Sequence, residues 1–192
     1  MNKILVLYYS KHGNTQNIAR QIARGIESIE SCEAILRTVP EIDANNETIP
    51  QDPKVTHEDL KECVGMAMGS PVRFGNMAAP LKHFIDSTSK EWLSGTLVDK
   101  PAVVFTSSAS LHGGQETVLQ SMMLPLLHHG MVILGIPYTE KELSSTSSGG
   151  TPYGVTHVEI NSNKNLTAEE SKLGFFIGQR IAKYSLALLN LD

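Results

Sequence analysis

The sequence predicts one α/β domain over residues 1–192, built on a parallel sheet of five strands with helices on both faces. Three observations support this prediction. Strand and helix patterns alternate along the chain, which is typical of parallel sheets. The strand candidates are continuous apolar runs, as expected where a sheet is covered on both faces. A length of 192 residues with 41% hydrophobic and 19% charged residues suits one folded domain with a full core.

The first third of the chain supplies two strands. The apolar run Ile4–Tyr9 predicts a strand buried on both faces, and isoleucines at helical spacing predict a helix over Thr15–Ser28. Ala34–Val39 predicts a second strand. Three prolines interrupt Pro40–Lys54, which therefore predicts a loop, and His57–Glu62 is at most a short helix.

The middle of the chain repeats the pattern. Val64–Ser70 predicts a third strand that ends before a proline, and Ala78–Ser87 predicts a helix with apolar residues on one side. Pro101–Ser107 predicts a fourth strand. Glu116–Leu127 follows as a helix, which we expect to be broken or bent near Pro125 because proline lacks an amide hydrogen.

The last third begins with a fifth predicted strand, Met131–Ile136. Pro137–Gly154 is rich in serine, threonine and glycine and predicts a long loop. The final helix is predicted over Thr167–Leu189. Its start is marked by a capping box, in which Thr167 and Glu170 satisfy each other's backbone amides.

Composition argues against several classes of protein. A net charge of −4, with basic residues scattered along the chain, disfavours a nucleic-acid binder. Cys32 and Cys63 fit neither a disulfide framework nor a metal site, so we expect no metal. No leader peptide and no membrane-spanning run is apparent, so we expect a cytoplasmic protein without membrane insertion.

The first predicted strand runs through a small polar loop directly into a helix. Hydroxyls at Ser10 and Thr15 flank Gly13 and Asn14, and a helix N-terminus favours a phosphate at this point. The spacing matches neither the dinucleotide fingerprint nor the nucleoside-triphosphate loop. A phosphomonoester such as that of flavin mononucleotide (FMN) fits. An ordinary strand–turn–helix joint capped by Asn14 or Thr15 explains the segment equally well.

Two further loops are expected at the same edge, because ligands of such sheets bind beyond the carboxyl ends of the strands. The loop after the third strand places Arg73 and Phe74 beside backbone amides, which suits the edge of a flat heteroaromatic ring. The loop after the fourth strand contains Gly113-Gly114, which allows close backbone approach. Taken singly, Arg73 also fits a surface salt bridge and Phe74 a packed loop residue.

Three other side chains are candidates for a role at this site or in the core. His128 or His129 could face a bound ring as a proton donor, whereas a histidine that caps a helix C-terminus is an equally good account of His129. Trp92, expected in a loop, has the usual role of a lone tryptophan as a core residue.

Five segments together resemble the WrbA-type NAD(P)H:quinone oxidoreductases, a family of flavodoxin-like FMN proteins. The resemblance covers nearly the whole chain in order, and the segments that carry it are Leu5–Ser10 with Gly13, Pro71–Met77, Gly113–Glu116, His128–Met131 and Gly149–Gly154. It implies a flavodoxin-like sheet of strand order 2-1-3-4-5, with NADH or NADPH as electron donor and quinones as substrates. It also implies a homotetramer whose FMN sites lie near subunit contacts.

The resemblance assigns roles to particular residues. His128 would lie at the flavin face and assist proton delivery as the catalytic residue, Trp92 would line the substrate pocket, and His12 would touch the nicotinamide. Residues implied to bind the cofactor lie in the three loops, with His128 in addition: Ser10, Lys11, His12, Gly13, Asn14, Thr15, Pro71, Val72, Arg73, Phe74, Gly75, Ser107, Ser108, Ala109, Ser110, Leu111, His112, Gly113 and His128.

The resulting prediction is an enzyme that reduces quinones by two electrons with ping-pong kinetics. Two alternatives share the fold. A flavodoxin would carry single electrons, although this chain is only mildly acidic and has the extended segment Pro137–Gly154. A non-catalytic flavin-binding regulatory protein is less well supported, since nothing in the sequence resembles a DNA-reading element.

Overall fold

A parallel sheet lies at the centre of the computed structural model, which describes residues 1–42, 52–160 and 164–189. Its strands run in the order β2-β1-β3-β4-β5, with β6 also paired to β4. This confirms the predicted α/β class and strand order. The strands are β1 (Asn2–Tyr8), β2 (Cys32–Thr38), β3 (Gly65–Pro71), β4 (Pro101–Ser108), β5 (Val132–Ile133) and β6 (Val155–Val158).

Side chains of β1 alternate between two cores. Leu5 and Leu7 pack into the core on one face, and Ile4, Val6 and Tyr8 pack into the core on the other. All five are fully buried. An uninterrupted apolar run is therefore what this central strand requires, because successive side chains point to opposite faces of the sheet.

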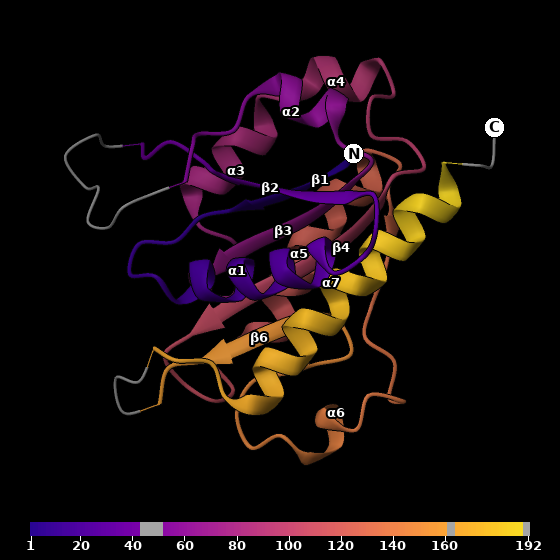
Figure 1. Cartoon of the computed structure of the whole chain (residues 1–192). Coiled ribbons are helices and arrows are strands. Elements are labelled where there is room, and N and C mark those ends of the chain that lie inside the picture. Colours follow the sequence, from indigo (N-terminus) through magenta and orange to yellow (C-terminus); the bar gives the residue numbers. More distant parts are fainter. Residues whose placement is uncertain (43–51, 161–163, 190–192) are drawn as a thin grey trace.

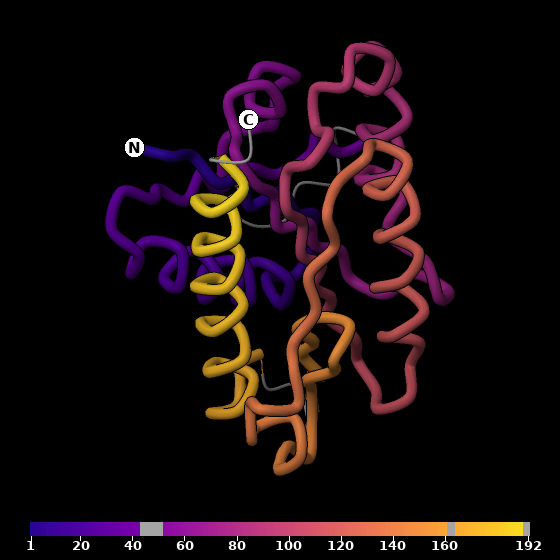
Figure 2. The backbone as a smooth tube through the Cα atoms, turned by 90° about the vertical axis from the view of Figure 1, so that its right-hand side faces the viewer, coloured from indigo at the N-terminus to yellow at the C-terminus, as the bar shows by residue number. Residues whose placement is uncertain are grey.

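Helices cover both faces of the sheet (Figures 1 and 2). On one face lie α1 (Asn14–Glu27) and α7 (Ala168–Leu188), which run side by side. On the other face lie α3 (Ala79–Asp86) and α5 (Gln115–His128), with the short helices α2 (His57–Glu62) and α4 (Ser89–Leu93) at one end. The capping box predicted at Thr167 and Glu170 is present and fixes the start of α7.

The predicted fifth strand is present next to β4, but it is shorter than the predicted span Met131–Ile136. The strand pairs with β4 only through Val132 and Ile133, and β6, which was not predicted, pairs with the other half of β4. The reason lies beyond Leu134: the amide of Ile136 donates to the carbonyl of Pro152 (2.9 Å) and no longer to β4. β5 and β6 therefore lie one after the other along the same side of β4. The segment between them contains the short helix α6 (Glu142–Ser145).

Two further expectations need correction. Trp92 lies in α4 instead of a loop, and it is half exposed instead of filling the core. The helix α5 continues through Pro125 to His128 without a break. Much of the predicted loop Pro40–Lys54 lies outside the described residues.

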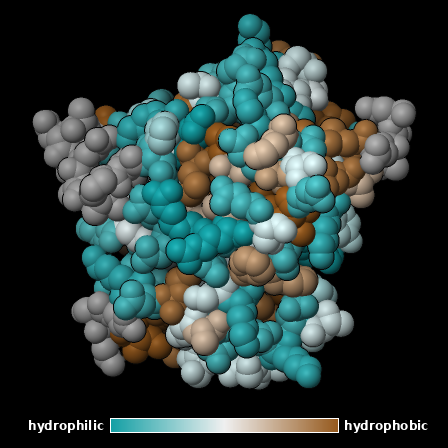
Figure 3. Space-filling view, in the orientation of Figure 1, coloured by the Kyte–Doolittle hydropathy of each residue, from teal (hydrophilic) through white to brown (hydrophobic). Residues whose placement is uncertain are grey.

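The surface over α1 and α7 is mostly hydrophilic, with scattered apolar residues (Figure 3). Among the residues that the structure describes, no helix combines the length and the apolar character needed to cross a membrane.

Candidate functional site

The loops that follow β1, β3 and β4 meet at the carboxyl edge of the sheet, on the left in Figure 1. They surround a cavity of about 210 Å³. Its lining consists of Ser10, Lys11, His12, Asn14, Thr15, Pro71, Val72, Arg73, Ser107, Ser108, Ala109, Ser110, Gly113 and Glu159. The structure thus brings together residues from all three loops that the sequence singles out.

The loop after β1 leaves the N-terminus of α1 open to an anion. Gly13 occupies the N-cap position with a φ of 99°, a conformation that glycine adopts readily. It has no side chain to accept from the first-turn amides, and that turn contains no acidic residue. Ser10 Oγ shapes the loop from inside by accepting from the amides of Gly13 (3.1 Å) and Gln16 (3.3 Å). The positive end of the helix dipole therefore faces the cavity.

Hydrogen bonds tie the three loops to one another. Thr15 Oγ1 and Ser107 Oγ lie 2.8 Å apart and join the first loop to the end of β4. Thr106 Oγ1 donates to the carbonyl of Ser70 (2.6 Å), which joins β4 to the end of β3. The cavity wall is thus fixed by buried hydroxyls, and each of these loops depends on another for its position.

The loop after β3 turns tightly. Arg73 and Asn76 exchange two backbone hydrogen bonds of 2.9 and 3.0 Å, and Phe74 and Gly75 between them both have positive φ. The turn leaves Val72 and Arg73 on the cavity wall, whereas the ring of Phe74 is fully exposed at the tip. Arg73, Lys11 and His12 supply basic groups to the lining.

Some predicted cofactor residues lie on these loops but outside the cavity lining. They are Gly13, Phe74, Gly75, Leu111 and His112. Gly13 has no side chain that could enter the lining. Phe74, Leu111 and His112 are exposed beside the cavity and face solvent in the single chain.

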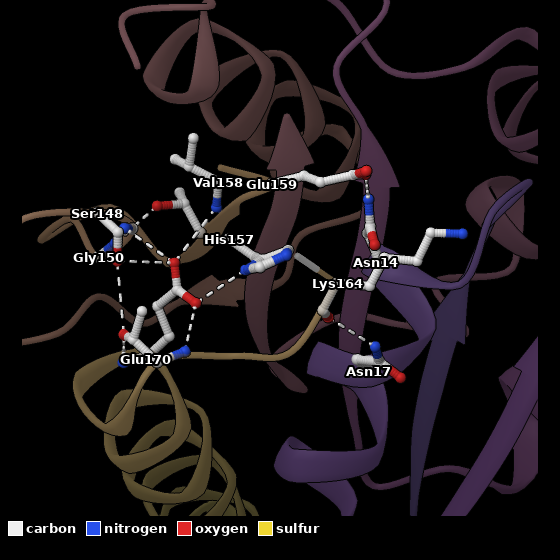
Figure 4. Close-up of polar contacts among 12 residues, drawn as sticks. Asn14, Asn17, Ser148, Gly150, His157, Val158, Glu159, Lys164 and Glu170 are labelled. Carbon is white, nitrogen blue, oxygen red and sulfur yellow. Dashed lines mark hydrogen bonds and ion pairs between the residues drawn. The ribbon is translucent and has the colours of Figure 1, made fainter. Parts of the chain in front are cut away.

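Sequence reasoning missed Glu159, the only acid among the described lining residues. It directly follows β6, and its carboxylate accepts a hydrogen bond from the side-chain amide of Asn14 (Figure 4). Its backbone amide donates to the carbonyl of Ser108 (2.9 Å). The sequence Val155–Val158 gave a usable signal, since a strand there would place the next residue at the binding edge.

His128 and Trp92 do not lie at this cavity. Together they line a second cavity of about 460 Å³ with residues of α3, α4 and α5, among them Ile85, Leu124 and Pro125. The physical reason is the direction of α5, which begins at the carboxyl edge of the sheet and ends at the opposite edge. Its 14 residues carry His128 about 20 Å away from Gln115. Within one chain, His128 is therefore not positioned to face a ring in the first cavity.

His129 is a packing residue of the second cavity. It is buried and its Nε2 lies 2.9 Å from Thr88 Oγ1. Burial lowers the pKa of His129, and His128 lowers it further, whereas Glu91 opposes both. The neutral form is therefore favoured, which agrees better with a structural role than with a charge at the end of α5.

The first cavity fits a phosphomonoester that carries a flat ring. The N-terminus of α1, which has no acidic residue in its first turn, and the space above Gly13, where an added Cβ would meet no atom within 4 Å, suit the phosphate. The side-chain oxygen of Asn14 is buried without a hydrogen-bond partner in the described structure. Glu159 is the one lining group whose charge opposes an anion.

Comparison with known proteins gives three informative matches. A family model described as NADPH-dependent FMN reductase matches residues 2–140. An NAD(P)H dehydrogenase (quinone) from Trichlorobacter lovleyi is 40% identical, over 98% of this chain and 99% of the relative. Among solved structures, a WrbA-like flavodoxin from Agrobacterium tumefaciens superposes with a TM-score of 0.69 at 21% identity, over 97% of this chain and 99% of that one.

Proposed function

Since this chain belongs to the NADPH-dependent FMN reductase family, we propose that it is an FMN-dependent NAD(P)H:quinone oxidoreductase of the WrbA type. The observation that carries the proposal is the meeting of three loops around an open helix N-terminus at the carboxyl edge of the sheet. The relative named NAD(P)H dehydrogenase (quinone) matches this chain in sequence over nearly the full length of both.

Each loop has a separate task in this proposal. The segment 10–15 holds the phosphate through backbone amides and hydroxyls. The turn that contains Val72 and Arg73, with Phe74 and Gly75 at its tip, lies along the ring. The segment 107–113 follows the ribityl chain and the ring edge. FMN, when bound, supplies the hydride chemistry that links the nicotinamide donor to the quinone.

The size of the cavity bears on kinetics and assembly. About 210 Å³ is smaller than a typical site for a whole ligand of this kind, so the cavity encloses the phosphate end and leaves the ring at its open rim. One exposed ring face then serves a flat donor and a flat acceptor in turn, which predicts ping-pong kinetics.

The open rim of the first cavity and the position of His128 and Trp92 support the predicted homotetramer. His128 and Trp92 lie at the far end of α5 on a surface with exposed Leu124 and Leu127. If these two residues serve a flavin site, the site belongs to a neighbouring copy whose open rim they cover. His128 would then assist proton delivery, and Trp92 would form a wall of the substrate pocket.

The decisive experiment is a spectrum of the protein mixed with FMN and desalted, followed by anaerobic addition of NADH and then benzoquinone. We expect retained flavin absorbance that bleaches with NADH and returns with benzoquinone. Retained flavin that fails to bleach would favour a flavodoxin-like electron carrier. A protein that retains no flavin would contradict the site assignment.

A further inference from the structure

Glu159 places a fixed negative charge in the phosphate end of the proposed flavin site. It lines the cavity together with Ser10, Asn14 and Thr15, and its carboxylate reaches the side chain of Asn14 across 145 positions of sequence (Figure 4). Asn14 is the first residue of α1. The carboxylate therefore lies at the helix N-terminus at which we place the phosphate.

The N-terminus of α1 has a side-chain acceptor in Ser10 Oγ, which binds the amide of Gln16, but it has no negatively charged group of its own. Its N-cap, Gly13, has no capping side chain, and the first turn contains no acid. Helix N-termini are stabilised by negative charge, and a carboxylate satisfies the same donors as a phosphate. Glu159 thus supplies a negative charge near this end of α1, held there by the side-chain amide of Asn14.

We propose that Glu159 is an internal competitor of the cofactor phosphate and sets how tightly the phosphorylated flavin is held. This inference rests on the proposed function. When a phosphomonoester enters, it meets the carboxylate at the same helix end, so the two anions repel one another or the carboxylate must leave Asn14. The carboxylate therefore lowers the affinity for FMN and has little effect on riboflavin, which has no phosphate.

Basic groups near the carboxylate reduce the repulsion without removing it. Lys11, His12 and Arg73 line the same cavity, and Lys164 Nζ donates to the carbonyl of His12 (3.2 Å). The positive charges of the lysines and the arginine attract the carboxylate and the phosphate alike. The change that Glu159→Gln makes in the difference between FMN and riboflavin affinity therefore isolates the effect of Glu159, because the basic groups are the same in both proteins.

The test measures the dissociation constants of FMN and riboflavin by equilibrium dialysis for the full-length protein and for Glu159→Gln. Glutamine keeps the size of the side chain and an oxygen that accepts from Asn14, but it removes the charge. We expect FMN to bind about tenfold more tightly to the variant, and riboflavin to bind as it does to the original protein.

A matched control is Glu27→Gln, at the opposite end of α1. It changes the net charge by the same amount about 20 Å from the helix N-terminus, beyond the screening length at 0.1 M salt. We expect it to leave FMN affinity unchanged. An equal gain in both variants would show a general charge effect and would overturn the proposed role of Glu159.

The remaining outcomes separate the two proposals. If the original protein and Glu159→Gln bind FMN equally, Glu159 does not compete with the phosphate. If Glu159→Gln binds FMN more weakly, Glu159 supports Asn14 instead. In either case only the inference fails. If neither protein binds FMN, the proposed function fails and the inference falls with it.

Discussion

Glu170 is a carboxylate buried at the N-terminus of α7, where the chain from the long loop and from β6 comes together (Figure 4). It accepts hydrogen bonds of 2.8 to 3.2 Å from His157 Nδ1, Ser148 Oγ and the amides of Gly149, Val158 and Thr167. Burial alone would raise the pKa of Glu170. The hydrogen bonds, above all that of His157, outweigh it and lower the pKa.

We predict that Glu170→Gln lowers the free energy of unfolding by about 2–3 kcal/mol at pH 7, because an amide cannot accept all of these bonds. A depressed carboxylate pKa stabilises the fold above the ordinary value near 4.5, and this stabilisation is lost as pH falls through the lower, folded value. Urea unfolding between pH 3 and 8 should therefore show a gap between the two proteins that narrows below about pH 4.5.

Glu169→Gln is the control for this prediction, since Glu169 lies in the same first turn of α7 and accepts none of the bonds described for Glu170. Loss of its interaction with the helix dipole should cost less than about 1 kcal/mol. A gap for Glu170→Gln that stayed constant down to pH 3 would mean that its charge contributes nothing.

At the scale of elements, the contact between α1 and α7 depends on glycines. A Cβ built on Gly178 would lie 2.1 Å from the carbonyl oxygen of Ile22 and 3.0 Å from Cα of Gly25. Backbone atoms cannot move aside as a flexible side chain can. The two helices therefore approach closely only because these positions carry no side chain.

We predict that Gly178→Ala destabilises the protein by about 2 kcal/mol, because the clash exceeds the roughly 1 kcal/mol that alanine gains in a helix. Equilibrium unfolding in urea measures this. Gly174→Ala is the matched control in the same helix, where the added methyl group would meet only the flexible side chain of Gln21 at 3.1 Å. If the two variants were equally stable, close backbone packing would not be limiting.

Most elements could be predicted from local pattern, and the exceptions have a common cause. The capping box at Thr167 and the apolar run at Ile4–Tyr9 are local signals, and both elements formed as expected. The predicted edge of the sheet was incomplete, because β6 shares β4 as a partner with β5 although 21 residues separate Ile133 from Val155. A strand as short as β5 has too few residues for a hydrophobic pattern that would show where it ends, or that a distant segment takes the next place along β4.

At the scale of the whole molecule, apolar side chains are exposed on α4 and α5. Trp92, Leu93, Leu124 and Leu127 are each at least half exposed. A surface of this kind suits contact with another protein, and the proposed homotetramer supplies one.

We predict that Leu124→Glu combined with Leu127→Glu shifts the protein to a smaller assembly in light scattering, since burying two carboxylates at a subunit contact is costly. The double variant should also bind FMN more weakly than the original protein, because the open rim of the first cavity is no longer covered by a neighbouring copy. Leu189→Glu, an exposed leucine at the end of α7, should leave the assembly intact. An unchanged mass of the double variant would exclude this face from the contact.

The sequence by itself determined the fold class, the strand order through its family resemblance, and the loops that we propose to carry the binding chemistry. The fold class and the loops follow from short-range patterns, because the polar segments come directly after apolar strands whose carboxyl ends share one edge. Only the tertiary structure decided that Glu159 reaches Asn14 and that His128 lies away from the cavity. The first is a contact between residues 145 positions apart, and the second depends on the direction in which α5 crosses the sheet. No local pattern records either relation.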